Sequence, residues 1–283
     1  MRVVVTGGAG RLGRYVCAAI GSCHQVIVAD RPVAVADDRV TIDVLDIDSL
    51  RTAFAGADAV VHLAGVDYDF HRRAEATMRT NALGTWNALQ VAAELHVQRF
   101  VLCSSVAALG LHEMRSDWAP QELPITDGHP ASPVEPYSVS KAVAETMARS
   151  FADGNLLDVV CLRPCTVVTA DNVDELLDPD AHIFLGEYVA ATDCADAFLA
   201  ALEAPAPGYG PYLVAAHDTL SDQDTLSFLS EALGRLPDTV DAQHYESNPR
   251  ASAFDIAATR RALDWSPQTT LSTLRDTLAA ASR

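Results

Sequence analysis

The chain has 283 residues, of which 49% are hydrophobic and 20% are charged, so it can bury a sizeable core in one large α/β domain or in two closely joined lobes. This composition excludes a disordered or fibrous protein. The formal net charge of −18 argues against nucleic acid or an anionic membrane surface as a partner, because both ligands select a positively charged surface.

Several features predict a cytoplasmic protein without a metal. A strand-like run begins at residue 2, which leaves no room for a leader, and no apolar stretch reaches the roughly 20 residues that cross a membrane. The six cysteines show no CxxC spacing and are expected to be reduced. The nine histidines form no cluster at metal-ligand spacing.

The first 165 residues alternate between short β-branched runs and longer periodic stretches. This alternation is typical of a parallel sheet covered on both faces, so we predict a doubly wound, Rossmann-type α/β fold. The expected strands are 2–6, 25–29, 40–43, 58–64, 98–104 and 157–163, and the expected helices are 11–21, 48–55, 73–96 and 136–153.

Beyond Pro164 the pattern is less regular, although a helix near 192–204 and a strand near 211–215 are still predicted. We expect residues 1–165 to form a dinucleotide-binding domain whose sheet is completed by about 188–218. Residues 166–187 and 219–283 are expected to form a small C-terminal substrate lobe.

A glycine-rich segment, Thr6-Gly7-Gly8-Ala9-Gly10-Arg11-Leu12-Gly13, lies between the first predicted strand and the first predicted helix. Glycines in this context let the backbone approach a pyrophosphate, whose charge is then bound by free amides at the helix N-terminus. Asp30 ends the second strand, 20 residues after Gly10, where a carboxylate binds the adenosine ribose and repels the 2′-phosphate of NADP. Arg31 partly offsets that repulsion, and Asp30 could instead be a turn residue before Pro32. The pattern favours NAD.

Tyr137 and Lys141 are four residues apart and therefore lie on one face of a predicted helix. A phenol, with a pKa of about 10, is a poor base near neutrality unless a nearby cation stabilises its phenolate. Lys141 is the only lysine among the 20 Lys and Arg residues, which indicates that its ammonium group is specifically required. A solvated helix face is the alternative for an isolated YxxxK pattern, but the glycine-rich segment favours catalysis.

Further motifs follow one another in a fixed order: Asp46-Ile47-Asp48, Val61-His62-Leu63-Ala64-Gly65, Asn81-Ala82-Leu83-Gly84-Thr85, Ser104-Ser105-Val106-Ala107-Ala108-Leu109-Gly110 and Leu162-Arg163-Pro164. Together with the glycine-rich segment and the Tyr137 helix, they make the chain resemble an extended short-chain dehydrogenase/reductase of the NAD-dependent epimerase/dehydratase family. The resemblance covers nearly the whole length.

The resemblance implies a catalytic role for four residues. Ser105 would bind the reacting substrate oxygen, Tyr137 would exchange its proton, and Lys141 would also bind the nicotinamide ribose. Asn81 would complete the set by holding a proton-relay water, whereas His62 is expected to be structural.

The resemblance also implies which residues line the cleft. The implied cofactor contacts are Gly7, Gly10, Arg11, Leu12, Gly13, Asp30, Arg31, Asp46, Ile47, Leu63, Ala64, Gly65, Tyr137, Lys141, Pro164 and Val167. The implied substrate contacts are Val66, Asp67, Ser105, Val106, Ala107, Tyr137, Cys165 and Thr166. The loop at 111–135, with His112 and Trp118, is expected to cover this pocket.

The reaction class is limited by which side chains are present. Dehydratases of the family carry an acid just after the serine, where this chain has Val106 and Ala107. Epimerases of nucleotide sugars and dehydrogenases of sugar acids need cations for their anionic substrates, but residues 164–234 contain no Arg or Lys. Arg163 and Arg250 remain candidate anion contacts.

We therefore predict an NAD-dependent oxidoreductase that acts on a secondary alcohol or ketone of a neutral or weakly anionic sugar, polyol or specialised metabolite. An NAD-retaining sugar or nucleotide-sugar epimerase is the first alternative. A non-catalytic NAD-binding regulator is less favoured, because the catalytic set is complete. By resemblance, a homodimer is expected to form through the helices at 73–96 and 136–153.

Overall fold

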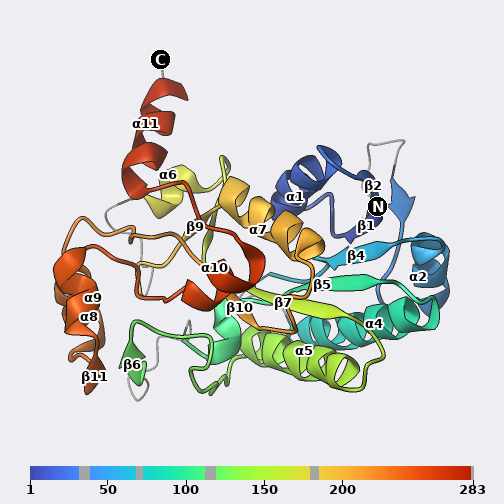
Figure 1. Ribbon diagram of the computed structural model, residues 1–283, viewed down its shortest axis with the longest axis horizontal. Coiled ribbons are helices and arrows are strands. Elements are labelled where there is room, and N and C mark those ends of the chain that lie inside the picture. The colour runs from blue at the N-terminus through green and yellow to red at the C-terminus, as the bar shows by residue number, and fades with distance from the viewer. Residues whose placement is uncertain (32–38, 68–72, 112–118, 179–184, 282–283) are drawn as a thin grey trace.

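A seven-stranded parallel sheet forms the centre of the computed structural model, which describes residues 1–31, 39–67, 73–111, 119–178 and 185–281 (Figure 1). The strand order is β10-β7-β5-β4-β1-β2-β3, and every neighbouring pair is parallel. This order confirms the predicted doubly wound fold. The strands are β1 (Arg2–Thr6), β2 (Gln25–Asp30), β3 (Val40–Thr41), β4 (Ala59–His62), β5 (Arg99–Cys103), β7 (Val159–Pro164) and β10 (Tyr212–Val214).

Helices cover both faces of this sheet because alternate strand residues point to opposite sides. Val3 and Val5 of β1 lie in one core cluster with Phe198, whereas Val4 lies in another with Leu89. The helices α1 (Arg11–Gly21) and α7 (Ala191–Glu203) pack together on one face, and α2 (Ile47–Phe54), α4 (Gly84–Glu94) and α5 (Pro136–Asp153) cover the other (Figure 1).

The helix expected over 73–96 consists of three segments. It begins as α3 (Ala74–Met78), widens into a π-helical turn at Arg79–Leu83, and continues as α4. Such a turn inserts one residue into the helical ladder and is frequent at functional sites. Here the widened turn carries Asn81.

Short elements follow the main sheet in sequence. A helical turn, η2 (Val106–Leu109), comes directly after β5. Two small parallel pairs are formed by β8 (Val167–Val168) with β9 (Val189–Ala190), and by β6 (Glu122–Leu123) with β11 (Thr239–Val240). The remaining helices are α6 (Val173–Leu176), α8 (Thr225–Leu233), α9 (Ala242–Ser247), α10 (Ala257–Leu263) and α11 (Leu271–Ala281). The division into a cofactor domain and a substrate lobe stays a prediction.

None of the helices in the described part of the chain combines the length and the apolar character that a membrane crossing requires.

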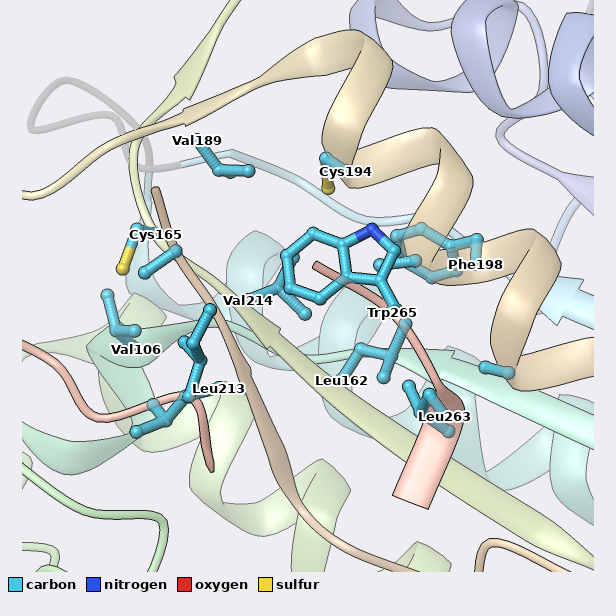
Figure 2. Packing of buried hydrophobic residues seen from close by; sticks show 14 of the residues in the cluster. Val106, Leu162, Cys165, Val189, Cys194, Phe198, Leu213, Val214, Leu263 and Trp265 are labelled. Carbon is cyan, nitrogen blue, oxygen red and sulfur yellow. The ribbon is translucent and has the colours of Figure 1, made fainter. Parts of the chain in front are cut away.

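The C-terminal segment is anchored in the main core by Trp265. Its ring is 6% exposed and lies in the cluster that contains Phe198 and Val214 (Figure 2). The indole Nε1 donates a hydrogen bond of 3.0 Å to the carbonyl oxygen of Asp193 at the start of α7. The segment is therefore part of the core rather than an appendage.

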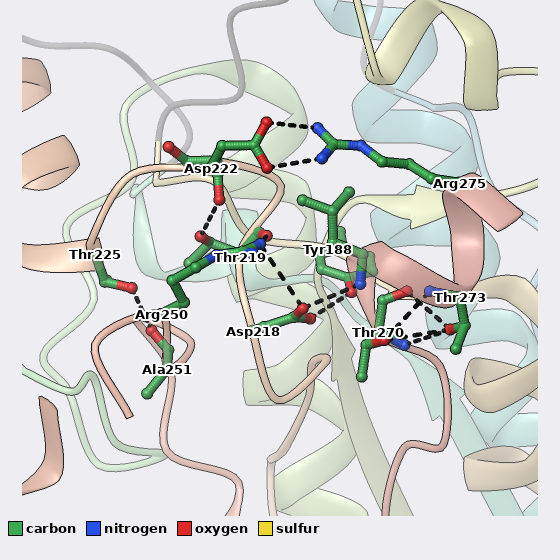
Figure 3. A network of polar contacts seen from close by, with 12 residues as sticks. Tyr188, Asp218, Thr219, Asp222, Thr225, Arg250, Ala251, Thr270, Thr273 and Arg275 are labelled. Atoms are coloured by element: carbon green, nitrogen blue, oxygen red, sulfur yellow. Dashed lines mark hydrogen bonds and ion pairs between the residues drawn. The ribbon is translucent and has the colours of Figure 1, made fainter. Parts of the chain in front are cut away.

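Polar contacts hold the next helix in place. Arg275 of α11 donates two hydrogen bonds, of 2.7 and 2.8 Å, to the Asp222 carboxylate (Figure 3). Asp218 accepts a hydrogen bond of 3.0 Å from the amide of Leu271, the first residue of α11.

Replacing Trp265 with alanine should lower the free energy of unfolding by about 3–5 kcal/mol, because a large buried ring is lost and a cavity remains. Urea denaturation followed by circular dichroism measures this. Trp265→Phe keeps most of the ring and should cost less. An unchanged midpoint for the alanine variant would show that the segment is not part of the folded core.

Candidate active site

A cleft of about 850 Å³ lies at the carboxyl edge of the sheet. Its walls include the segments that follow β1, β4, β5 and β7, together with Tyr137 and Lys141 of α5. Parallel strands place their carboxyl ends at one edge, so segments distant in the sequence meet there. The cleft is lined by all the expected cofactor and substrate residues except Asp46 and Ile47.

The glycine-rich turn brings the backbone of β1 close to the N-terminus of α1. Gly7 has a φ of 71°, and its carbonyl oxygen accepts a hydrogen bond of 3.0 Å from the Gly10 amide. A Cβ on Gly13 would lie 2.3 Å from that carbonyl oxygen, so any side chain there would displace the turn. No side chain caps α1, whose first residues line the cleft, and this terminus therefore fits an anionic group such as a pyrophosphate.

Asp30 lies at the other end of the cofactor portion of the cleft. Its carboxylate accepts hydrogen bonds of 2.9 Å from the Ala9 amide and 2.7 Å from the Arg31 amide. The acid thus fixes the glycine-rich turn and also faces the cleft, where it is available to ribose hydroxyls. Both features fit a dinucleotide with an unphosphorylated adenosine ribose, which is NAD.

Asp46 and Ile47 do not line the cleft. The Asp46 carboxylate caps α2 by accepting hydrogen bonds of 3.0 Å from Asp48 N and 3.4 Å from Ser49 N. Ile47 packs against the core beneath the sheet. The strand expected over 40–43 ends already at Thr41, so the residues that reach the cleft come earlier in the chain and are Ile42, Asp43, Val44 and Leu45.

Tyr137 and Lys141 are positioned by the beginning of α5. Glu135 caps this helix by accepting hydrogen bonds of 2.8 Å from Tyr137 N and 3.2 Å from Ser138 N. Proline at the first helical position presets the backbone angle. The tyrosine therefore occupies a rigid first turn.

Three of the four expected catalytic residues meet in the cleft. Lys141 Nζ lies 5.7 Å from the centre of the Tyr137 ring and donates a hydrogen bond of 2.8 Å to the Cys103 carbonyl oxygen. The Ser105 hydroxyl accepts a hydrogen bond of 3.1 Å from the Ala107 amide and lies close enough to Tyr137 to lower the pKa of its phenol. A phenol, a hydroxyl and an ammonium group thus share one site.

The charges of the site act on one another. Burial raises the pKa of the Tyr137 phenol above its ordinary value, and the Lys141 cation and the Ser105 hydroxyl offset only part of that rise. Burial alone lowers the pKa of Lys141, but nearby negative groups, Tyr137 and Asp67 among them, raise it above its ordinary value. Lys141 is therefore an ammonium group at neutral pH.

Asn81 is 2% exposed and does not line the cleft. Its Oδ1 accepts a hydrogen bond of 2.7 Å from Val66 N, and its Nδ2 donates bonds of 3.0 Å to Val66 O and Ser140 Oγ. The carboxamide fixes the segment after β4 against α5. The proton-relay role of Asn81 stays a prediction.

His62 belongs to a buried polar chain behind the site. Its Nδ1 lies 2.8 Å from Thr6 Oγ1, and its Nε2 lies 3.2 Å from Thr85 Oγ1, which donates a bond of 2.6 Å to Asn81 O. Burial, helped by the nearby Lys141 charge, lowers the pKa of His62 to about 3. The neutral ring acts as a structural link, in agreement with its expected role.

Sequence reasoning missed a second group of cleft residues. Cys103 and Ser104 directly precede Ser105, so their place at the end of the predicted strand 98–104 could have identified them as cleft residues. Residues of the segment around α6 lacked any recognisable motif; they are Thr169, Asn172, Glu175 and Leu176. Of the loop expected to cover the pocket, His112 and Trp118 lie outside the described residues.

Comparison with known proteins identifies the family. A family model, described as the NAD dependent epimerase/dehydratase family, matches residues 3–182. An L-arabinose 1-dehydrogenase (NAD(P)(+)) from Haloferax volcanii is 31% identical over 216 residues, which cover 73% of this chain and 84% of that protein. A uronate dehydrogenase from Agrobacterium fabrum is 29% identical over 173 residues, 58% of this chain and 62% of that protein.

Solved structures show the same fold. A short-chain dehydrogenase/reductase superfamily protein from Agrobacterium tumefaciens with bound NAD has a TM-score of 0.77 at 22% identity, covering 100% of this chain and 97% of that one. A UDP-N-acetylglucosamine 4-epimerase from Bacillus cereus has a TM-score of 0.75 at 20% identity, covering 100% and 99%.

The family model and the relatives show an NAD-dependent oxidoreductase or epimerase. The chain belongs to the NAD-dependent epimerase/dehydratase family.

Gly13→Ala should weaken NADH binding roughly tenfold or more, because the added methyl group displaces the turn that binds the pyrophosphate. Titration by NADH fluorescence measures the affinity. Gly21→Ala, at the other end of α1, is the matched control, since its nearest neighbour would lie 3.8 Å away. Equal affinities for the two variants would contradict this cofactor site.

Proposed function

We propose that the protein is an NAD-dependent dehydrogenase that oxidises a secondary alcohol, or reduces the corresponding ketone, of a neutral or weakly anionic sugar, polyol or specialised metabolite. The observation that carries the proposal is that Tyr137, Ser105 and Lys141 line one cleft, with Lys141 Nζ 5.7 Å from the centre of the Tyr137 ring. The chemistry needs one base, one hydrogen-bond donor and one cation, and these residues supply them.

In the oxidation direction, Tyr137 as phenolate takes the proton from the substrate hydroxyl. NAD, when bound, is the acceptor of the hydride that leaves the same carbon. Ser105 binds the substrate oxygen as its charge changes, and Lys141 stabilises the phenolate before proton transfer. The products are the carbonyl compound, NADH and one proton.

The charges that line the cleft support a substrate without a strong negative charge. Among the described residues, the lining cations are Arg11, Arg31 and Lys141. Arg11 is ion-paired with Asp67, Lys141 is bound to the Cys103 carbonyl, and Arg31 adjoins Asp30 at the adenosine end. Glu175 adds a further negative charge.

The two other candidate anion contacts do not line the cleft. Arg163 is buried and donates two hydrogen bonds to Glu145. Arg250 donates a bond of 3.3 Å to Thr219 O and lies 4.0 Å from Asp218. Near Tyr137, a carboxylate or diphosphate bound in the described part of the cleft would therefore lack a guanidinium partner that is not already paired, because the remaining lining arginine, Arg31, lies beside Asp30, the proposed ribose contact.

A free aldose matches this charge pattern, and the Haloferax volcanii relative is an L-arabinose 1-dehydrogenase. For such a substrate the oxidised group is the ring hydroxyl at C1, and the product is the lactone. We therefore place neutral aldoses ahead of uronates and nucleotide sugars.

Purified protein with NAD should produce NADH, seen by its absorbance, with at least one neutral sugar or polyol from a panel of L-arabinose, D-galactose, D-glucose and myo-inositol. Galacturonate and glucuronate should be poorer by about tenfold or more in kcat/KM, because their carboxylate lacks a cationic partner. Tyr137→Phe should lower kcat by about 10²–10⁴-fold, since it removes the acid/base group.

Two outcomes would overturn this proposal. Preference for the uronates would contradict the charge argument. No turnover of any sugar, with NAD retained through purification, would instead favour an epimerase, and a UDP-glucose 4-epimerase from Halalkalibacterium halodurans is 29% identical to this chain over 197 residues.

We further propose a homodimer formed through α4 and α5, which lie side by side on one face of the sheet (Figure 1). Two large apolar side chains of this region are exposed, Leu83 by 48% and Trp86 by 41%. The Trp86 ring also meets Phe151 of α5 edge-on, with ring centres 5.4 Å apart. Large aromatic residues of this kind commonly dominate interface energies.

Trp86→Arg should convert the dimer into a monomer, because a charge would have to be buried in the interface. Size-exclusion chromatography with light scattering measures the mass. Leu156→Arg is the control, since Leu156 is 62% exposed beyond the C-terminal end of α5. A wild-type protein with the mass of one chain would contradict the dimer.

A further inference from the structure

A buried network of polar side chains joins the catalytic helix to two strands of the sheet. Its centre is Glu145 of α5, which is 8% exposed. The Glu145 carboxylate accepts a hydrogen bond of 2.5 Å from Ser104 Oγ. It also accepts bonds of 2.8 and 2.7 Å from Nε and Nη2 of Arg163, the penultimate residue of β7.

Each member of the network adjoins a residue of the active site. Glu145 lies four residues after Lys141, one turn along the same face of α5. Ser104 directly precedes Ser105, and Arg163 directly precedes Pro164, which lines the cleft. Because Ser104 itself lines the cleft, the network begins at the wall of the site and extends behind it.

Further bonds hold the network in place. Arg163 Nη1 donates a hydrogen bond of 3.1 Å to Asp127 O, and the Tyr209 hydroxyl donates one of 2.6 Å to Glu145 O. The Asp127 carboxylate accepts a bond of 2.6 Å from Leu213 N of β10. The ion pair is thus tied to β10 as well as to β7.

A buried ion pair of this kind adds little net stability, because the free-energy cost of removing two charges from water is about as large as the free energy of their attraction. Its bonds are directional, however. The planar guanidinium binds both carboxylate oxygens, which fixes the angle as well as the distance between α5 and β7.

A second ion pair links β5 with the segment before β7 and provides an internal comparison. Arg99, the first residue of β5, donates bonds of 3.0 and 2.7 Å to Asp158. This pair lies at the amino ends of the strands, at the edge away from the cleft, and the Asp158 side chain is 46% exposed. It makes no contact with α5 among the bonds of the described residues.

We propose that Glu145, Arg163 and Ser104 form a positioning unit that sets α5 against β5 and β7, so that Tyr137 reaches Ser105 and Lys141 reaches the Cys103 carbonyl. The inference rests on the proposed function, in which Tyr137 and Lys141 are catalytic. The three residues transfer no proton and act only through the groups that they place.

The test compares Glu145→Gln, the double variant Glu145→Met with Arg163→Met, and the control Asp158→Asn. Glu145→Gln should lower kcat by about tenfold to a hundredfold, because small displacements of catalytic groups are costly. The apparent Kd for NADH should stay within about twofold, since the glycine-rich turn is unaffected.

The double variant separates positioning from stability. Two methionines remove both buried charges together, so the midpoint of thermal unfolding should be higher in the double variant than in Glu145→Gln. The kcat should nevertheless stay low, and the rise of activity with pH should move to higher pH, because Tyr137 is then less well stabilised as a phenolate by Lys141 and Ser105. Asp158→Asn should leave kcat and the pH profile unchanged.

Recovery of kcat and of the wild-type pH profile in the double variant would overturn the proposal, as would an equal loss of kcat in Asp158→Asn. A readout without substrate keeps this test separate from the proposed function. Lys141 is the only lysine, so protein made with lysine labelled with ¹³C at Cε alone gives one lysine signal in the ¹³C NMR spectrum. That signal should move in the double variant and stay in place in Asp158→Asn; an unmoved signal in both would contradict the positioning role even if no sugar were oxidised.

Discussion

The hydrogen bond from Lys141 to the Cys103 carbonyl is the contact on which the arrangement of this site depends. The last carbonyl groups of a parallel strand lie at the edge of the sheet, where the ladder has ended and acceptors are available. An ammonium group brought there by α5 satisfies one of them and remains charged. The same cation lies 5.7 Å from the ring centre of Tyr137. The hydrogen bond therefore joins α5 to β5 at the point where Lys141 acts on the base.

Two buried polar groups without net charge lie near this cation. The Thr6–His62–Thr85–Asn81 chain passes behind the cleft, and its histidine is neutral because burial lowers its pKa to about 3. The compensated Glu145–Arg163 pair lies one helical turn away. Neither group competes with Tyr137 for the charge of Lys141, and both fix backbone segments that carry active-site residues.

Most of the fold and much of the candidate site were predictable from the sequence because they depend on local patterns. The alternation of apolar strands and helices predicted the sheet, and the bounds of α1 and α5 agree with the expected ranges. Tyr137 and Lys141 were identifiable by their spacing, since a helix places residues four apart on one face.

The parts that were missed depend on tertiary contacts. Because β3 ends at Thr41, the cleft is lined by Asp43–Leu45 and not by Asp46. The end of a strand is set by its pairing with a neighbouring strand, which local sequence preference does not reveal. The contribution of α6 to the cleft carries no motif. Arg163 was considered an anion contact because its sequence does not reveal Glu145, its partner 18 residues earlier. The cytoplasmic location stays a prediction.

The most direct test of the ammonium–phenol pair is a pH titration of the single lysine signal, in ¹³C-labelled wild-type protein and in Tyr137→Phe. In the wild type the pKa of Lys141 should lie above that of an ordinary lysine, because nearby negative groups outweigh burial, and Tyr137→Phe should lower it. A Lys141 pKa that is ordinary or depressed, and that is unmoved by Tyr137→Phe, would contradict the pairing on which the proposed chemistry rests.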